Sequence, residues 1–118
     1  METEVKKYHN LKIRNEPYPY LTEIQKERKL YEGRSKKSVE ERKIKSGDVI
    51  VLTDIADDSS WALCLVTELL PFPDFGSAYD LLIPGSNREE VVKLYAELYH
   101  TAPESVYAIG IQLLDKSS

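Results

Sequence analysis

The middle of the chain contains two apolar segments joined by a short polar connection. Residues 48–53 read D-V-I-V-L-T, residues 61–70 read W-A-L-C-L-V-T-E-L-L, and residues 54–60 between them are polar. Aliphatic side chains occupy both parities of each segment, which predicts two strands that are buried on both faces. Because the connection is too short to hold a crossover helix, the two strands form a hairpin. This hairpin excludes a doubly wound fold of alternating strands and helices.

Weaker patterns on either side of the hairpin predict the other elements. Further strands are expected over residues 5–14, 28–34 and 105–114, and helices over residues 15–27, 77–83 and 88–100, with a possible helical turn at 39–42. The last helix has the clearest start, because Ser86 with Glu89 and Asn87 with Glu90 form two overlapping capping boxes. This order of elements predicts an α+β fold, a small mixed or antiparallel β-barrel of about five strands with three helices packed across its ends.

Composition indicates a single domain over residues 1–118 and an ordinary globular protein. Hydrophobic residues make up 42% and charged residues 31% of the chain. No apolar run approaches the roughly 20 residues that span a bilayer, and the charged N-terminus lacks the apolar segment of a signal peptide. The one cysteine, Cys64, lies in an apolar run and is expected to be a buried core residue. We therefore expect a cytoplasmic protein, or a nuclear one, with no membrane partner.

Charge is distributed unevenly along the chain. Residues 26–45 contain nine basic and four acidic side chains, a balance of +5, whereas residues 46–118 contain three basic and twelve acidic ones, a balance of −9. This asymmetry predicts one positive patch on an acidic body, which favours a local anionic ligand over general nucleic-acid coating. The sequence lacks a cysteine–histidine cluster and a glycine-rich phosphate loop, so we expect neither a metal site nor a cofactor.

Five short motifs occur in a fixed order. They are H-N-L-K-I at residues 9–13, R-K-L-Y-E-G-R at 28–34, R-K-I-K-S-G-D at 42–48, F-P-D-F at 72–75 and Y-A-I-G-I-Q-L at 107–113. Together they resemble the ASCH domain family, a branch of the PUA-like barrels, over nearly the whole chain. The third motif fits the Arg-x-Ile-x-x-Gly-Asp stretch of that family. The resemblance implies a PUA-like β-barrel with a positively lined cleft that binds RNA or nucleotide-like ligands.

One branch that is similar in fold hydrolyses the acetyl group of N4-acetylcytidine with a lysine, a threonine and a glutamate. By this resemblance Lys29 falls at the lysine, but Glu32 stands where that branch has its threonine nucleophile. Glu27 replaces the glycine expected before the lysine pair, and Glu89 and Glu90 are candidates for the glutamate. The missing threonine argues against the same acyl-enzyme mechanism in this chain.

Lys29, Glu32 and Arg34 are the residues most strongly expected to form the cleft. A lysine desolvated in a cleft can act as a base, a neighbouring carboxylate can position its proton, and the planar fork of an arginine fits phosphate or carbonyl oxygens. Gly33 is a candidate bulge that would turn side chains of both parities toward one pocket. The alternative is a salt bridge between Glu32 and Arg34 on a barrel strand, with Lys29 in solvent.

Other residues are candidates for ligand contacts at the mouth of the cleft. Arg42, Lys43 and Lys45 could guide phosphates, or could form an exposed charged turn with no ligand. Tyr8, Tyr18, Tyr20 and Tyr31 could stack on a base, or could pack at the edges of the barrel, and Tyr18 and Tyr31 are the main candidates.

Two further residues are expected to be structural. Asp48 is expected to accept backbone N–H groups in the turn that it ends, and His9 to be hydrogen-bonded within the protein.

Three functions remain open at this point. The first is a module that binds RNA or a modified nucleoside or nucleotide. The second is a small hydrolase, either an N4-acetylcytidine amidohydrolase or a ribonuclease, with Lys29 and Glu32 as the proton-handling pair. The third is a protein-interaction domain, such as a coregulator module, with the acidic C-terminal half as its contact face. The sequence specifies neither a partner nor an oligomeric state.

Overall fold

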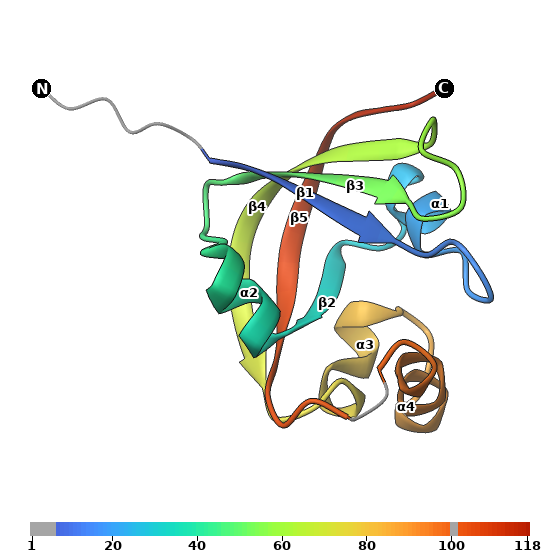
Figure 1. Cartoon of the computed structure of the whole chain (residues 1–118). Coiled ribbons are helices and arrows are strands. Elements are labelled where there is room, and N and C mark those ends of the chain that lie inside the picture. Colours follow the sequence, from blue (N-terminus) through green and yellow to red (C-terminus); the bar gives the residue numbers. More distant parts are fainter. Residues whose placement is uncertain (1–6, 100–101) are drawn as a thin grey trace, which may run out of the picture.

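The computed structural model describes residues 7–99 and 102–118 of the chain, which form a curled sheet with helices packed on it (Figure 1). The strands are β1 (Tyr8–Ile13), β2 (Tyr31–Ser35), β3 (Val49–Asp54), β4 (Trp61–Phe72) and β5 (Val106–Lys116). The helices are α1 (Tyr20–Gln25), α2 (Lys36–Arg42), α3 (Tyr79–Leu82) and α4 (Arg88–Ala96), with a short 3-10 helix, η1 (Gly76–Ala78), before α3. Within these described residues, no helix is both long and apolar enough to cross a membrane.

The five strands form one mixed sheet in the order β1-β3-β4-β5-β2. The pair β1–β3 is parallel, and β3–β4, β4–β5 and β5–β2 are antiparallel. By this order β1 and β2 are the two edge strands, and the sheet between them curls into a half-barrel (Figure 1). The α+β class and the five strands are confirmed. The helical turn considered at residues 39–42 is a full helix, α2, and brings the number of α-helices to four.

The predicted central hairpin is β3–β4, and it supplies much of the core. Val49 pairs with Leu65 and Thr53 with Trp61 in an unbroken antiparallel register. The side chains of Ile50, Leu52 and Cys64 are fully buried. Since the same strands also pair with β1 and β5, the hairpin lies at the centre of the sheet and fixes the position of both edges.

The polar residues before α2 and α4 explain where these helices begin. The Ser35 hydroxyl accepts a hydrogen bond from the Ser38 amide at 3.1 Å, and the Asn87 side chain accepts one from the Glu90 amide at 2.9 Å. Of the two predicted capping boxes, only the second forms, and only in part, because the Glu90 carboxylate accepts the side-chain amide of Asn87 at 3.2 Å rather than its backbone N–H. Ser86 instead donates its hydroxyl to the Ile83 carbonyl at 2.5 Å, at the end of α3.

The observed boundaries differ from the expected ones at several element ends. The helix α4 ends at Ala96, four residues earlier than predicted, and His100 lies outside the described residues. The strand β4 runs on to Phe72, and β5 to Lys116. The first strand was predicted from residue 5, and in the described residues it is β1, which begins at Tyr8.

The suggested bulge at Gly33 is wrong. Gly33 pairs with Ala108 in an uninterrupted β2–β5 ladder. The register shifts lie in the β4–β5 ladder instead, one between Leu63 and Cys64 and one between Val66 and Glu68, opposite Gly110. The absence of a side chain at Gly33 has a different cause, because a Cβ there would lie 2.9 Å from the hydroxyl of Tyr95.

The helices η1, α3 and α4 gather at the open end of the half-barrel, near β2 (Figure 1). Phe75 is 5% exposed and stacks on Tyr95 of α4 with a centroid distance of 4.2 Å. This stack fixes α4 against the core, and so positions one wall of the cleft described next.

Candidate functional site

A cleft of about 380 Å³ opens between the two edge strands and α4. Its basic lining residues are Lys12 and Arg14, at the end of β1, and Arg34 on β2. The other polar and aromatic lining residues are Glu32, Ser35, Ser38, Tyr20, Tyr95 and Tyr99. The cleft therefore joins segments that are far apart in the sequence, and its cationic side chains outnumber its one carboxylate.

Glu32 and Arg34 form an ion pair in this cleft. They are two residues apart on β2 and so share one face of the strand. The Arg34 Nη2 donates to Glu32 Oε2 at 2.9 Å, and the Gly33 amide donates to Glu32 Oε1 at 3.1 Å. The side chain of Arg34 is 19% exposed and that of Glu32 is 5% exposed. Burial acts to lower the pKa of Arg34, but the Glu32 carboxylate raises it above its ordinary value, so the guanidinium stays charged.

Arg34 also connects the two edges of the sheet. Its Nη2 donates to the backbone carbonyl of Lys12, on β1, at 2.8 Å. Because β1 and β2 are not paired with each other, this side chain is a bridge across the opening of the half-barrel. The guanidinium is thus held from both sides, which fixes its position in the cleft.

Lys29 lies behind the cleft rather than in its lining. It is 1% exposed, its Nζ donates to the carbonyl of Leu82, and the same Nζ lies 5.8 Å from the centroid of the Tyr20 ring. Burial lowers the pKa of Lys29 from its ordinary 10.5 to about 8, against the opposing effect of Glu32. The sequence-based alternative of a solvated Lys29 is therefore wrong, while the amine itself does not face the cleft lining.

Two buried tyrosines line the cleft: Tyr20, a minor candidate for stacking, and Tyr95, which was missed as a site residue. Tyr20 and Tyr95 line the cleft and are 3% and 4% exposed, and neither hydroxyl has a hydrogen-bond partner among residues 7–99 and 102–118. Burial raises the pKa of both phenols, and the nearby carboxylate of Glu32 adds to the effect, so both keep their protons. Tyr95 lies in an apolar helical stripe and therefore has the sequence pattern of a core residue. The one sequence signal for its position is Gly33, which faces the Tyr95 hydroxyl.

The two tyrosines that were the main candidates lie elsewhere. Tyr31 donates its hydroxyl to Glu68 Oε2 at 2.6 Å and is not part of the cleft lining. It crosses over Gly110 to reach Glu68, and a Cβ on that glycine would approach both side chains. Tyr18 packs edge-on against Tyr20 at a centroid distance of 4.8 Å, so it supports the wall of the cleft without lining it.

The predicted basic residues near the mouth are also outside the cleft lining. Arg42 Nη1 donates to the carbonyl of Asn10 on β1 at 3.5 Å. Lys43 adopts the left-handed conformation, with φ 56°, that ends α2. Lys43 and Lys45 border a different hollow, of about 440 Å³, together with Tyr107. We call residues 42–45 the basic turn.

Asp48 and His9 form a structural pair beside the basic turn. Asp48 Oδ2 accepts the Lys45 amide and lies 2.9 Å from His9 Nε2. Burial acts to raise the pKa of Asp48, but these hydrogen bonds bring it below its ordinary value. The predicted roles of Asp48 as an acceptor of backbone N–H groups and of His9 as a hydrogen-bonded residue are confirmed.

The remaining candidates do not enter the cleft. Glu89 and Glu90 are exposed in the first turn of α4 and are absent from the cleft lining. Cys64 is fully buried, as predicted, and burial raises the pKa of its thiol to about 12. The part of the chain that the structure describes holds no group of three or more His, Cys, Asp and Glu residues able to bind a metal ion.

Comparison with known proteins identifies similar folds. No protein-family model matches the chain, and no curated protein matches it. The structure of hypothetical protein PH0355 is similar with a TM-score of 0.69 and 23% identity, over 91% of this chain and 99% of that one. Protein PF0455 from Pyrococcus furiosus gives a TM-score of 0.62 and 23% identity, over 92% and 98%. Protein EF3133 from Enterococcus faecalis V583, of family DUF984, gives 0.60 and 11%, over 98% and 80%. At these identities the likeness shows the fold, a single small domain with a curled mixed sheet.

Proposed function

We propose that this protein is a nucleotide-binding domain of the ASCH type, whose cleft holds a nucleoside or nucleotide that is either free or part of RNA. The observation that carries the proposal is the set of polar groups in the cleft. A charged ion pair, Glu32 with Arg34, lies beside the hydroxyls of Tyr20 and Tyr95, which lack a protein partner in the described chain. Unpaired buried polar groups are costly, so a polar ligand that reached these hydroxyls would be stabilised by them.

The chemistry of the lining fits a nucleotide better than a simple anion. A base presents donors, acceptors and an aromatic face to the Glu32 carboxylate and the tyrosines, whereas a bare phosphate would be repelled by that carboxylate. Lys12 and Arg14 are both exposed on the wall that β1 supplies, where they can contact a phosphate attached to the ligand. A volume of about 380 Å³ lies within the usual range for small-ligand sites. The motif resemblance to ASCH domains points in the same direction.

The test is titration of the labelled protein with the four ribonucleoside 5′-monophosphates, followed by amide NMR. We expect shifts centred on Glu32–Arg34 and on the Tyr95 region. The variant Tyr95→Phe should bind about tenfold more weakly, because it removes one hydrogen-bonding group from the ligand site. It should be at least as stable as the parent protein, because the hydroxyl has no protein partner to lose.

The matched control is Tyr31→Phe, which removes a hydroxyl that is bonded to Glu68 away from the cleft lining. We expect it to lower stability slightly and to leave nucleotide binding unchanged. If no nucleotide binds at millimolar concentration, or if both tyrosine variants bind like the parent protein, the proposal is wrong. If no nucleotide shifts any amide signal, the protein-interaction function is favoured instead.

Hydrolysis is a second candidate, and one observation favours it. The pKa of Lys29 is near 8, so a sizeable fraction of this amine is neutral at slightly alkaline pH and could act as a base with Glu32. Its contact with the Leu82 carbonyl would have to break before the amine could reach a cleft ligand. Incubation with N4-acetylcytidine and with short RNA tests this function, because free acetate or cleaved RNA that disappears in Lys29→Met would establish it.

A further inference from the structure

A second hollow adjoins the cleft at the end of β1. It has a volume of about 400 Å³ and is lined by Arg14, Asn15, Glu16, Asp54, Ile55 and Ala56. Two of these residues, Arg14 and Ile55, also line the cleft. The cleft and this second hollow are therefore neighbouring parts of one groove, with Arg14 and Ile55 at the boundary.

The boundary is a fixed ridge. Ile55 is 64% exposed, which is high for an isoleucine, and its backbone amide donates to the carbonyl of Ile13 at 2.9 Å. This hydrogen bond continues the β1–β3 pairing by one residue beyond the end of β3. An exposed aliphatic side chain on a rigid backbone can pack against the face of a base or sugar on either side of it.

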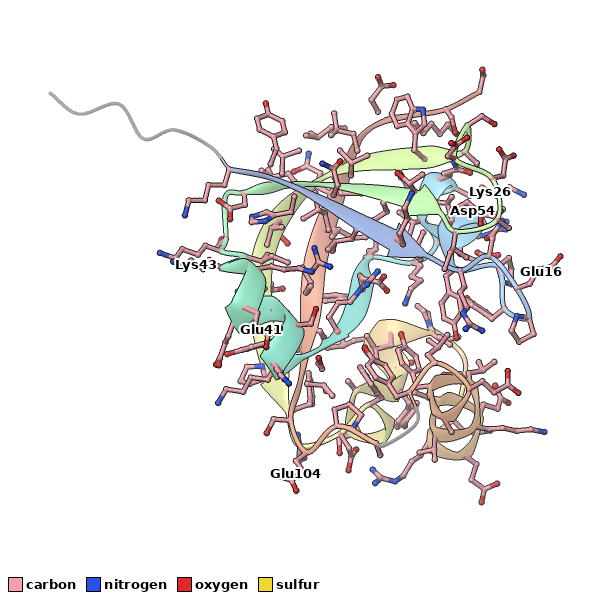
Figure 2. The ribbon with its side chains drawn as sticks, in the orientation of Figure 1. Glu16, Lys26, Glu41, Lys43, Asp54 and Glu104 are labelled. Atoms are coloured by element: carbon pink, nitrogen blue, oxygen red, sulfur yellow. The ribbon has the colours of Figure 1, made fainter. Side chains whose placement is uncertain are left out.

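The sign of the charge changes across this ridge. On the cleft side the groove presents Lys12, Arg14 and Arg34, and beyond the ridge it presents the carboxylates of Glu16 and Asp54. Figure 2 shows Glu16 and Asp54 at the same end of the molecule, on the loop after β1 and at the end of β3. A second phosphate is unsuited to the acidic side, whereas a group that donates hydrogen bonds is suited to it.

The polar groups of the second hollow are only partly used by the protein. Asn15 is fully engaged, because its amide donates to the Thr22 hydroxyl at 2.9 Å and accepts the Thr22 backbone amide at 3.0 Å. Asp54 Oδ1 accepts the Ala56 amide at 2.9 Å. The described residues supply no hydrogen bond to Asp54 Oδ2. Asp54 is therefore held in place with one carboxylate oxygen free for a ligand.

We propose that the second hollow is a ribose subsite, so that the groove binds two consecutive nucleotides of an RNA strand. The base of the first nucleotide lies in the cleft, the phosphate between the two nucleotides lies against Arg14, and the Asp54 carboxylate accepts a hydrogen bond from the 2′-hydroxyl of the second. Acidic side chains bind ribose hydroxyls in this way in dinucleotide sites, and the 2′-hydroxyl is the group that distinguishes RNA from DNA. This inference rests on the proposed function and adds the length and the sugar of the ligand.

Calorimetric titration with three kinds of probe tests the inference. The probes are the four ribonucleoside 3′-monophosphates, the sixteen ribodinucleotides and the matching deoxyribodinucleotides. For the favoured sequence we expect the ribodinucleotide to bind about tenfold more tightly than the mononucleotide and about tenfold more tightly than the deoxyribodinucleotide, which is the effect of one hydrogen bond to a charged group.

The variant Asp54→Asn should abolish most of the preference for ribose and leave mononucleotide binding unchanged. The side-chain oxygen of asparagine still accepts the Ala56 amide, so the fold is retained. The matched control is Asp58→Asn, which removes the same charge from the exposed loop that follows β3, outside both hollows, and should keep the preference.

Equal binding of mononucleotides and ribodinucleotides, equal binding of ribose and deoxyribose forms, or an unchanged preference in Asp54→Asn would each overturn the ribose subsite and leave the proposed function standing. Failure of the mononucleotides and dinucleotides alike would overturn both.

Discussion

The Glu32–Arg34 pair of the cleft and the basic turn come from the same charged part of the sequence but are physically different. In the cleft, Glu32 and Arg34 are mostly buried and are tied to each other and to the β1 backbone. The basic turn and the adjoining helix α2 instead carry exposed charges, and the Lys37–Glu41 pair is 3.9 Å apart with side chains 84% and 65% exposed. Figure 2 shows Lys43 and Glu41 projecting at the opposite side of the molecule from Asp54 and Glu16.

Exposed and buried charged pairs differ in what they indicate about function. Exposed pairs gain little because water screens them, and they need no ligand to explain them. A buried ion pair is costly to desolvate and remains only if its geometry and its other hydrogen bonds compensate. The net charge of residues 26–45 therefore indicates only a region of candidate ligand contacts, and burial distinguishes Glu32 and Arg34 within it.

The largest effect expected from this contrast is on stability. Glu32→Ala should lower the free energy of unfolding by about 4 kcal/mol, because Arg34 would keep its charge in a mostly buried position without its partner. Urea unfolding followed by Trp61 fluorescence measures the change. The matched control is Glu40→Ala, which breaks the exposed Lys36–Glu40 pair and should give no measurable change. Equal effects of the two substitutions would remove the distinction between the regions.

The next effect depends on pH and comes from Lys29. Its pKa falls from 10.5 to about 8 on folding, so the unfolded chain binds this proton more tightly and Lys29 costs stability below pH 8. The cost should decrease as pH rises from 8 toward 10.5. Lys29→Met should therefore gain stability relative to the parent protein by at most about 3 kcal/mol at pH 7, and the gain should shrink toward pH 10.

The pH dependence of this difference is the decisive measurement. Lys29→Met also removes the donor to the Leu82 carbonyl, which lowers its stability by an amount that does not vary with pH. The titrations of Cys64 and of the buried tyrosines occur in both proteins and cancel in the difference. A difference in unfolding free energy that stays constant between pH 7 and 9.5 would show that Lys29 has an ordinary pKa in the folded protein.

Much of the fold could be predicted because its signals are local. The β3–β4 hairpin follows from two aliphatic segments with a short connection, and the start of α4 follows from the cap at Asn87. Parity on β2 correctly placed Glu32 and Arg34 on one face. The boundaries failed where tertiary contacts decide them, as at the end of α4 and in the extension of β4 to Phe72.

The candidate site depends on contacts between residues that are far apart in the sequence. Arg34 reaches Lys12 only because the sheet curls and brings β2 toward β1, and the hydroxyl of Tyr95 lies close to Gly33 only because α3 and α4 fold back over the open end. Neither contact has a periodic or compositional signal. The sequence therefore placed Glu32 and Arg34 on one strand, but it did not reveal that the candidate aromatic and basic residues Tyr18, Tyr31, Arg42, Lys43 and Lys45 lie outside the cleft lining.

The smallest expected effect tests whether the basic turn belongs to the site after all. Lys43→Asn combined with Lys45→Gln should leave the affinity for a mononucleotide unchanged within about twofold, because neither side chain lines the cleft and salt screens exposed charges beyond about 8 Å at 0.15 M. Asparagine suits position 43 because it tolerates the left-handed conformation found there.

The matched substitution in the cleft, Arg14→Gln, removes only one charge but should weaken binding about tenfold. Calorimetry in 0.15 M salt measures both variants. If the double variant loses more affinity than Arg14→Gln, the basic turn contacts the ligand directly and the site extends along α2.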